Sequence, residues 1–168
     1  MKENWDQSFK LLLASEGGFV IDRGGATNLG VTQTTWEMYV ERTATIDEMK
    51  SLMRSDVEPL YKRLYWDRCW CDRMPSGIDY LLFDFAVNAG VAQSVLLLQR
   101  SVGAHPDGAM GPLTFAATIT QNPVDLIERF SNQKKQFYIS LHDPVNEQGW
   151  MNRLVRVREE ALAMVNNG

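Results

Sequence analysis

Helical hydrophobic periodicity recurs along nearly the whole chain, and one glycine-rich stretch, residues 15–32, interrupts it. This stretch reads SEGGFVIDRGGATNLGVT and holds five of the twelve glycines. The apolar residues before it recur at helical spacing, and Gly17 is placed to end that first helix. Strand-like alternation is scarce, and its best candidate is a hairpin in which residues 19–21 pair with residues 29–31. The sequence therefore predicts a mainly α fold with a small β-hairpin after the first helix.

Helix start and stop signals divide the rest of the chain. Capping boxes predict three helix starts, formed by Thr34 with Glu37, Thr45 with Glu48, and Ser76 with Asp79. Other starts are predicted at Pro112, at Asn122-Pro123 and after Gly149, with a helix around Pro59 and helix ends at Gly90 and Gly103. The break at residues 73–77 predicts two lobes, an N-terminal one over residues 1–74 and a helical C-terminal one over residues 75–168.

Composition restricts the class of protein. The chain has 168 residues, 45% of them hydrophobic, which suits one compact domain or two small lobes that share a core. The net charge of -4 argues against a nucleic-acid-binding protein. The N-terminal residues lack the pattern of a secretory signal, and no apolar run reaches membrane-spanning length. We therefore expect a protein that is made in the cytoplasm and does not insert stably into a membrane. We also expect it to be a monomer.

The two cysteines carry no predicted function. Cys69 and Cys71 are too close in sequence for an unstrained disulfide, and His105 and His142 are remote from them. We expect reduced, partly buried thiols, and neither a metal ion nor a cofactor.

The glycine-rich stretch places two carboxyl groups in different settings. Glu16 follows the first helix, where the helix dipole and a desolvated surrounding both favour the protonated acid. Asp22 lies in the predicted hairpin, where a wetter setting keeps it ionised, and Thr27 follows it. A protonated carboxyl group beside an ionised one is the arrangement that glycosidases use. A helix end and a hairpin loop whose Asp caps backbone amides explain the same residues without catalysis, and spacing does not decide between them.

The segment EGGFVIDRGGATNLGVT resembles the signature of the family 108 glycoside hydrolases. The later segments LLFDFAVNAG, LLLQRSVG, DGAMGPLTF and GWMNRLVRVR resemble, in the expected order, the peptidoglycan-binding domain that accompanies this family. The resemblance implies a lysozyme-like N-acetylmuramidase that cuts the β-1,4 bond between N-acetylmuramic acid and N-acetylglucosamine. It gives Glu16 the position of the general acid, and the order of Glu16, Asp22 and Thr27 is similar to that in small phage lysozymes.

One departure from the family pattern concerns the second catalytic group. The family usually has more residues between Glu-Gly-Gly and the next acid, whereas Asp22 follows Glu16 by six positions. Glu37 or Glu41 on the following helix are therefore alternatives to Asp22.

The resemblance also implies that the partners are glycan strands and peptide stems of peptidoglycan. The predicted substrate-binding residues are Gly25, Asn28, Trp36, Asp84, Asn88, Trp150 and Arg153. Each also has a structural explanation, as a turn, a packed aromatic ring or an internally bonded polar group.

Three functions remain open from the sequence. The preferred one is a phage endolysin that acts on the periplasmic cell wall after release through a membrane lesion. The second is a bacterial muramidase that remodels the wall for secretion of a toxin or another protein. The third is a peptidoglycan-binding module without catalysis.

Overall fold

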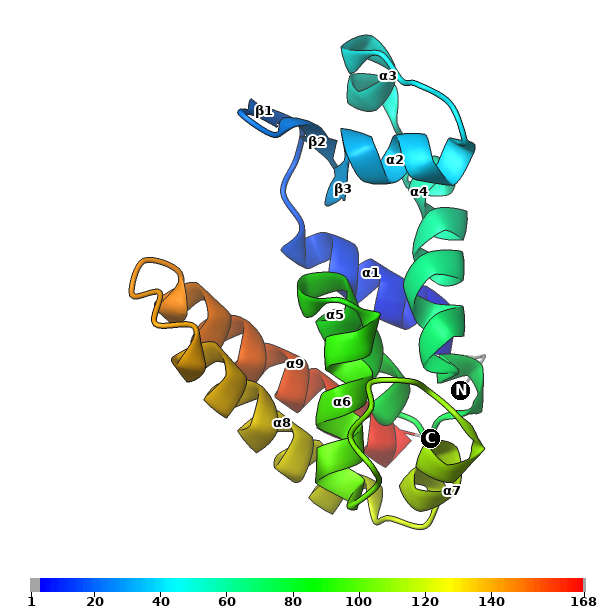
Figure 1. The fold of residues 1–168 in the computed structure, drawn as a ribbon, viewed down its shortest axis with the longest axis vertical. Coiled ribbons are helices and arrows are strands. Elements are labelled where there is room, and N and C mark those ends of the chain that lie inside the picture. The colour runs from blue at the N-terminus through cyan, green and yellow to red at the C-terminus, as the bar shows by residue number, and fades with distance from the viewer. Residues whose placement is uncertain (1–3, 168) are drawn as a thin grey trace. The chain divides into compact units, whose positions relative to one another are not determined.

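The computed structural model describes residues 4–167, which form a mainly helical fold with one small sheet (Figure 1). Before the larger helices, the elements are α1 (Trp5–Ser15), β1 (Val20–Asp22), β2 (Gly25–Asn28), β3 (Val31–Thr32), α2 (Gln33–Val40), α3 (Ile46–Ser51) and α4 (Arg54–Tyr61). After short helical turns, the chain continues through α5 (Ile78–Ala89), α6 (Val91–Val102), α7 (Pro112–Ile119), α8 (Pro123–Ser140) and α9 (Glu147–Asn167). The predicted fold class is therefore confirmed.

The chain divides into two compact units. The smaller unit contains Asp6–Leu64, and the larger one contains Trp5 and the chain from Tyr65 onward. The smaller unit holds most of α1, the sheet and α2 to α4, and the larger one holds α5 to α9.

The sheet has three antiparallel strands in the order β1-β2-β3, so the two-stranded pairing predicted from the sequence was wrong. Ile21 pairs with Ala26 and not with residues 29–31, because the chain already reverses at Arg23 and Gly24. The Asp22 carboxylate accepts the Gly24 N–H at 2.7 Å and closes this turn. A second reversal, at residues 29–30, brings β3 beside β2.

The predicted helix starts are confirmed at three places and shifted at three. One of the shifted starts is that of α9, which begins at Glu147 and not after Gly149. Thr45, Asn122 and Pro112 cap or open α3, α8 and α7 as predicted. The helix α2 starts earlier than predicted, because Thr32 and not Thr34 accepts the N–H of a residue three positions on. For α5 the cap residue is Gly77, whose N–H is bound by the Asp79 carboxylate at 2.9 Å.

The helix α4 starts before Pro59, which lies in its interior and not near its first turn as predicted. A π-helical segment, Lys62–Trp66, follows directly. Proline interrupts regular helical hydrogen bonding, and π segments place side chains out of the ordinary helical register.

The core of the larger unit is built around α5. Nine consecutive residues of this helix, Ile78 to Ala86, are buried, and α6, α8 and α9 pack against it. The start of α5 packs closely against the backbone of α9, since a Cβ on Gly77 would lie 2.3 Å from the Ala161 carbonyl oxygen. Cys69 and Cys71 are both buried and unbridged, as expected. Among the described residues, no helix is long and apolar enough to cross a membrane.

Candidate active site

Glu16 lies directly after the C-terminal end of α1. Its N–H donates to the Leu13 carbonyl at 3.2 Å, so its backbone closes the last turn of the helix. The side chain is half-buried, and the exposed Gly17 and Gly18 follow it. The sequence prediction for the end of this helix is therefore confirmed.

The Glu16 carboxylate lies against the backbone of Gly30. A Cβ on Gly30 would be 2.8 Å from Glu16 Oε2 and 2.6 Å from the Tyr61 hydroxyl oxygen. Gly30 also has φ +76°, a conformation that L side chains rarely adopt. Only glycine therefore leaves room for both the carboxylate and the hydroxyl at this turn.

The other two predicted catalytic residues lie on the sheet. Asp22 is exposed at the end of β1, opposite Gly25, and one of its oxygens accepts the Gly24 N–H. Thr27 is half-buried in the middle strand, where Val20 and Thr32 are its neighbours. Gly25 has φ +107° and opens the middle strand directly after the turn. The exposed setting expected for Asp22 is thus present.

Two predicted substrate-binding residues have internal partners. The Asn28 amide is buried and donates to the Met49 carbonyl at 2.9 Å, and this contact ties β2 to α3. Trp36 is also buried, and its indole N–H donates to Glu48 at 3.0 Å. Both residues hold the smaller unit together in this structure.

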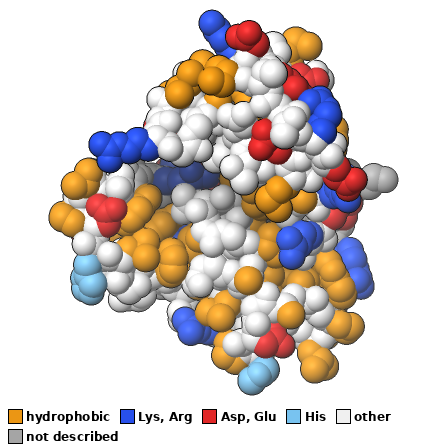
Figure 2. Space-filling model, turned by 45° about the horizontal axis from the view of Figure 1, so that its top comes forward, with side chains coloured by type: hydrophobic (Ala, Val, Ile, Leu, Met, Phe, Trp, Pro, Cys, Tyr) orange, Lys and Arg blue, Asp and Glu red, His pale blue; other side chains and the backbone are white. Residues whose placement is uncertain are grey.

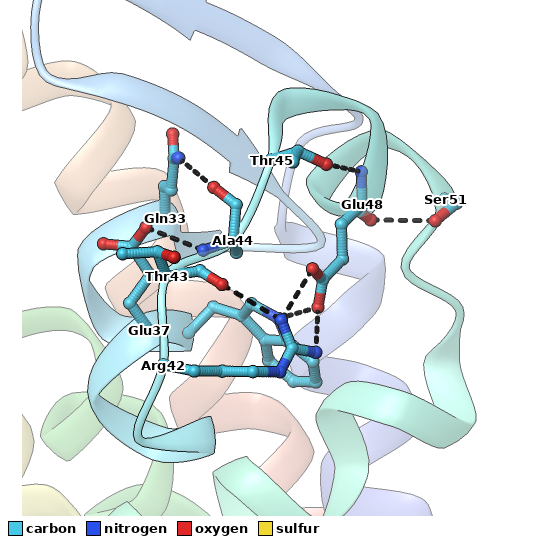
Figure 3. Close-up of polar contacts among 9 residues, drawn as sticks. Gln33, Glu37, Arg42, Thr43, Ala44, Thr45, Glu48 and Ser51 are labelled. Carbon is cyan, nitrogen blue, oxygen red and sulfur yellow. Dashed lines mark hydrogen bonds and ion pairs between the residues drawn. The ribbon is translucent and has the colours of Figure 1, made fainter.

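The alternative acids are placed on α2 and its C-terminal cap. Glu37 accepts the Ala44 N–H at 2.9 Å, as Figure 3 shows, and Glu41 is an exposed cap residue with φ +57°. In the same cluster, Glu48 binds Arg42 (Figure 3). Glu48 also accepts the Trp36 indole N–H, as described above. Hydrogen bonds from Arg42 and Trp36 lower the pKa of Glu48 to about 2. Through these contacts Glu37 and Glu48 stabilise the segment that connects α2 to α3.

A buried ion cluster lies in the larger unit. Asp84 of α5 is fully buried and pairs with Lys134 of α8 and Arg153 of α9, each at 2.8 Å. Burial opposes the ionisation of Asp84, but the two cations outweigh it and hold the pKa of this carboxyl group below its ordinary value. Asp84 was predicted to bind substrate, but it has no exposed surface in this structure. Its contacts join three helices.

Asn88 lies one turn after Asp84 on α5. It forms a polar and aromatic group with Tyr138 of α8 and Trp150 of α9. The Tyr138 hydroxyl donates to the exposed Asn88 at 2.9 Å, and its ring stacks on the half-buried indole of Trp150 at 5.3 Å. Arg153 is half-buried and follows Trp150 on α9. Asn88, Trp150 and Arg153 therefore retain the exposed surface that binding a ligand requires.

Gln99 organises the loop before α7. Its amide nitrogen donates to Asp107 at 2.7 Å, and its oxygen accepts the Gly108 N–H at 2.8 Å. The amide nitrogen also donates to the Ala109 carbonyl and the Thr114 hydroxyl. The DGAMGP turn is thus held by one buried side chain.

Sequence reasoning missed Lys134 and Tyr61. Lys134 continues the apolar row formed by Leu126, Phe130 and Tyr138 at spacings of four, and that position predicts burial. Tyr61 offers no comparable signal, since its hydroxyl meets the Leu29 carbonyl 32 positions away in the sequence.

Comparisons with known proteins agree with this arrangement. The family model described as glycosyl hydrolase 108 matches residues 9–90, and a model described as a predicted peptidoglycan domain matches residues 93–155. The solved structure of Brucella abortus SagA is 31% identical, with a TM-score of 0.90, covering 98% of this chain and 97% of that chain. The chain belongs to the glycosyl hydrolase 108 family. The comparison with curated proteins gives no match.

Membership of the glycosyl hydrolase 108 family makes the protein a glycoside hydrolase of the muramidase type with a peptidoglycan-binding domain. The hydrolase match contains Glu16, Asp22, Thr27 and Tyr61, and the peptidoglycan match contains Lys134, Trp150 and Arg153. On the face that Figure 2 presents, acidic and basic side chains are intermixed. Among the described residues, no group of three or more His, Cys, Asp or Glu side chains is placed to hold a metal ion.

Proposed function

We propose that this protein hydrolyses the β-1,4 bond between N-acetylmuramic acid and N-acetylglucosamine in bacterial peptidoglycan. The observation that carries the proposal is the placement of the Glu16 carboxylate, at the end of α1 and against the side-chain-free backbone of Gly30. This carboxyl group lies within the part of the chain that matches the hydrolase family.

The proposed mechanism divides the chemistry between two carboxyl groups. Glu16 gives its proton to the glycosidic oxygen as the bond to the leaving sugar breaks. Asp22, exposed at the end of β1, either orients the attacking water or stabilises positive charge at the sugar carbon. Thr27, one strand away, holds that water through its hydroxyl group.

The larger unit supplies substrate binding in this proposal. The exposed amide of Asn88, the indole of Trp150 and the guanidinium of Arg153 offer hydrogen bonds, a stacking face and a positive charge. Glycan strands and peptide stems present the matching groups, which are sugar faces, amides and carboxylates. The match to a peptidoglycan domain over residues 93–155 supports this assignment for Trp150 and Arg153.

The decisive experiment is digestion of purified sacculi. New reducing ends at muramic acid, detected by mass spectrometry, are the expected result. Reducing ends at glucosamine or anhydromuramic ends would contradict the proposed bond specificity. Glu16→Gln is expected to abolish cleavage while sacculus binding and the melting temperature stay unchanged, and full activity of this variant would refute the acid assignment.

The roles of Asp22 and Thr27 are tested separately. Asp22→Asn and Thr27→Ala are each expected to lower the rate at least about tenfold if the two residues position the water. Glu37→Gln and Glu41→Gln are the matched controls and are expected to retain activity. If the loss instead follows Glu37 or Glu41, the second catalytic group lies on α2.

We further propose the biological role of an endolysin that degrades the wall from the periplasm after another protein has opened the membrane. Expression in bacteria with and without a separate membrane-permeabilising protein tests this role. Lysis only in the presence of the permeabilising protein is expected. A gene neighbourhood of secretion components, together with toxin retention in a deletion strain, would instead support the role in secretion.

A further inference from the structure

The turn between β2 and β3 adopts an unfavourable backbone conformation. Its loop consists of two residues, Leu29 with φ 51° and Gly30 with φ 76°, between the paired Asn28 and Val31. Two positive φ angles are typical of the type I′ hairpin turn, which prefers Asn-Gly. Leucine lacks the short polar side chain that makes this conformation tolerable for Asn. The turn therefore depends on contacts from outside the hairpin.

Tyr61 supplies such a contact. This last residue of α4 donates its hydroxyl hydrogen to the Leu29 carbonyl at 2.9 Å. The Tyr61 side chain is only 1% exposed, and its ring contacts the Phe9 ring of α1 with centroids 5.6 Å apart. The Arg54 guanidinium lies over the same Phe9 ring at 5.1 Å. Both ends of α4 thus contact α1 at Phe9, about two helical turns before Glu16.

The Leu29–Gly30 turn lies close to Glu16, the proposed acid. The Tyr61 hydroxyl oxygen, Glu16 Oε2 and Glu16 Cγ all lie within 3 Å of the point where a Cβ on Gly30 would stand. The Glu16 carboxylate therefore lies beside the Tyr61 hydroxyl, on the same side of the Gly30 backbone. A shift of the turn would change the surface against which the carboxylate rests.

We infer that Tyr61 is a positioning residue for Glu16. Its hydroxyl holds the Leu29–Gly30 turn, and the bare Gly30 backbone then fixes the direction in which the Glu16 carboxyl group points. The inference rests on the proposed function of Glu16 as the acid. Because proton transfer to the leaving oxygen depends on alignment within the bound complex, loss of the hydroxyl affects the chemical step more than substrate binding.

The test is Tyr61→Phe, which removes one oxygen and retains the ring that packs on Phe9. With soluble peptidoglycan fragments as substrate, kcat is expected to fall about tenfold or more, while KM changes less than about twofold. Tyr80→Phe is the matched control, since it removes another hydroxyl group on a buried side chain, one that donates to Glu160 in the larger unit. It is expected to lower the melting temperature by a similar amount and to leave kcat unchanged.

A merely structural role for Tyr61 would give a lower melting temperature with unchanged kcat, and this result would overturn the inference. An equal loss of kcat in Tyr80→Phe would overturn it as well, because the effect would then follow stability. Full activity of Glu16→Gln alone refutes the proposed function, whereas an inactive Glu16→Gln with a fully active Tyr61→Phe refutes only the positioning role.

Discussion

The buried cluster of Asp84, Lys134 and Arg153 leads to an asymmetric prediction. It contains one carboxylate and two cations, so its members are not equivalent. Asp84→Asn leaves two buried or half-buried cations without their counter-charge. Breaking a buried pair in this way costs about 3–5 kcal/mol. In a chain of this length, that cost lowers the melting temperature by roughly 6–20 °C.

Lys134→Met is expected to change the free energy of unfolding less than Asp84→Asn does, because Asp84 keeps its two hydrogen bonds to Arg153. The change removes one charge-assisted hydrogen bond, worth about 1.5–3 kcal/mol. It also removes a buried ammonium group, whose dehydration costs several kcal/mol. Burial, together with the nearby guanidinium groups of Arg153 and Arg156, lowers the pKa of Lys134 despite the neighbouring carboxylate, so dehydration opposes the gain from the hydrogen bond. The net change in the free energy of unfolding is therefore expected to stay within about 1.5 kcal/mol of zero.

Urea unfolding at neutral pH, followed by circular dichroism, measures both variants. The pH dependence provides a second check, since the folded-state pKa of Asp84 lies below its value in the unfolded chain. The stabilisation by Asp84 is thus complete above about pH 4 and is lost as the pH falls through the lower, folded-state pKa. The gap between wild type and Asp84→Asn should narrow over this acidic range. Equal losses in the two variants at neutral pH, or a larger loss in Lys134→Met, would refute the reasoning.

Three further predictions concern other parts of the chain. Glu48→Gln is expected to lower the melting temperature at neutral pH but not below about pH 2. The stabilisation by the Glu48 carboxylate is lost as the pH falls from about 4.3, its value in the unfolded chain, through the folded-state pKa of about 2. A constant difference in melting temperature between wild type and variant across a pH series would contradict this. Gln99→Ala is expected to speed hydrogen exchange at the Gly108 amide, because the substitution removes the side-chain oxygen that accepts this N–H. Unchanged exchange would show that the loop is stable without the Gln99 side chain. Gly30→Ala is expected to cost roughly 2–5 kcal/mol of stability and to abolish sacculus digestion, because backbone strain adds to a clash with Glu16 and Tyr61. Gly103→Ala, at a similar φ of +72° with no atom within 4 Å of the added Cβ, is the control and should show the strain alone.

Local chemistry explains which parts of the fold were predictable. Helix ends at Gly90 and Gly103, and helix starts at Pro112 and Asn122, depend on residues within one turn of each boundary. Those positions were predicted correctly. The start of α2 was misplaced because several neighbouring threonines are equally good caps by type, and only the path of β3 makes Thr32 the cap.

Non-local contacts explain what the sequence did not predict. The strand partners of residues 20–22 depend on which of two glycine-containing turns reverses the chain, and both had suitable residues. Around the candidate site, Glu16 was identified from a motif, whereas the contact of Tyr61 depends on how α4 returns to the hairpin. The internal partners of Asn28 likewise come from the end of α3 and beyond. The roles assigned to Asp22, Thr27 and the remaining binding residues stay predictions.

The close approach of Gly77 to the Ala161 carbonyl has a consequence for synthesis on the ribosome. Ser76 also donates to the Met164 carbonyl at 3.1 Å, so the beginning of α5 is completed by the last turns of α9. The packing of this core helix of the larger unit is consequently finished only after residues 161–164 have been synthesised, which is long after all residues of the smaller unit. During that interval the apolar surface of α5 is accessible to chaperones. Truncations within α9 should therefore impair folding of the larger unit.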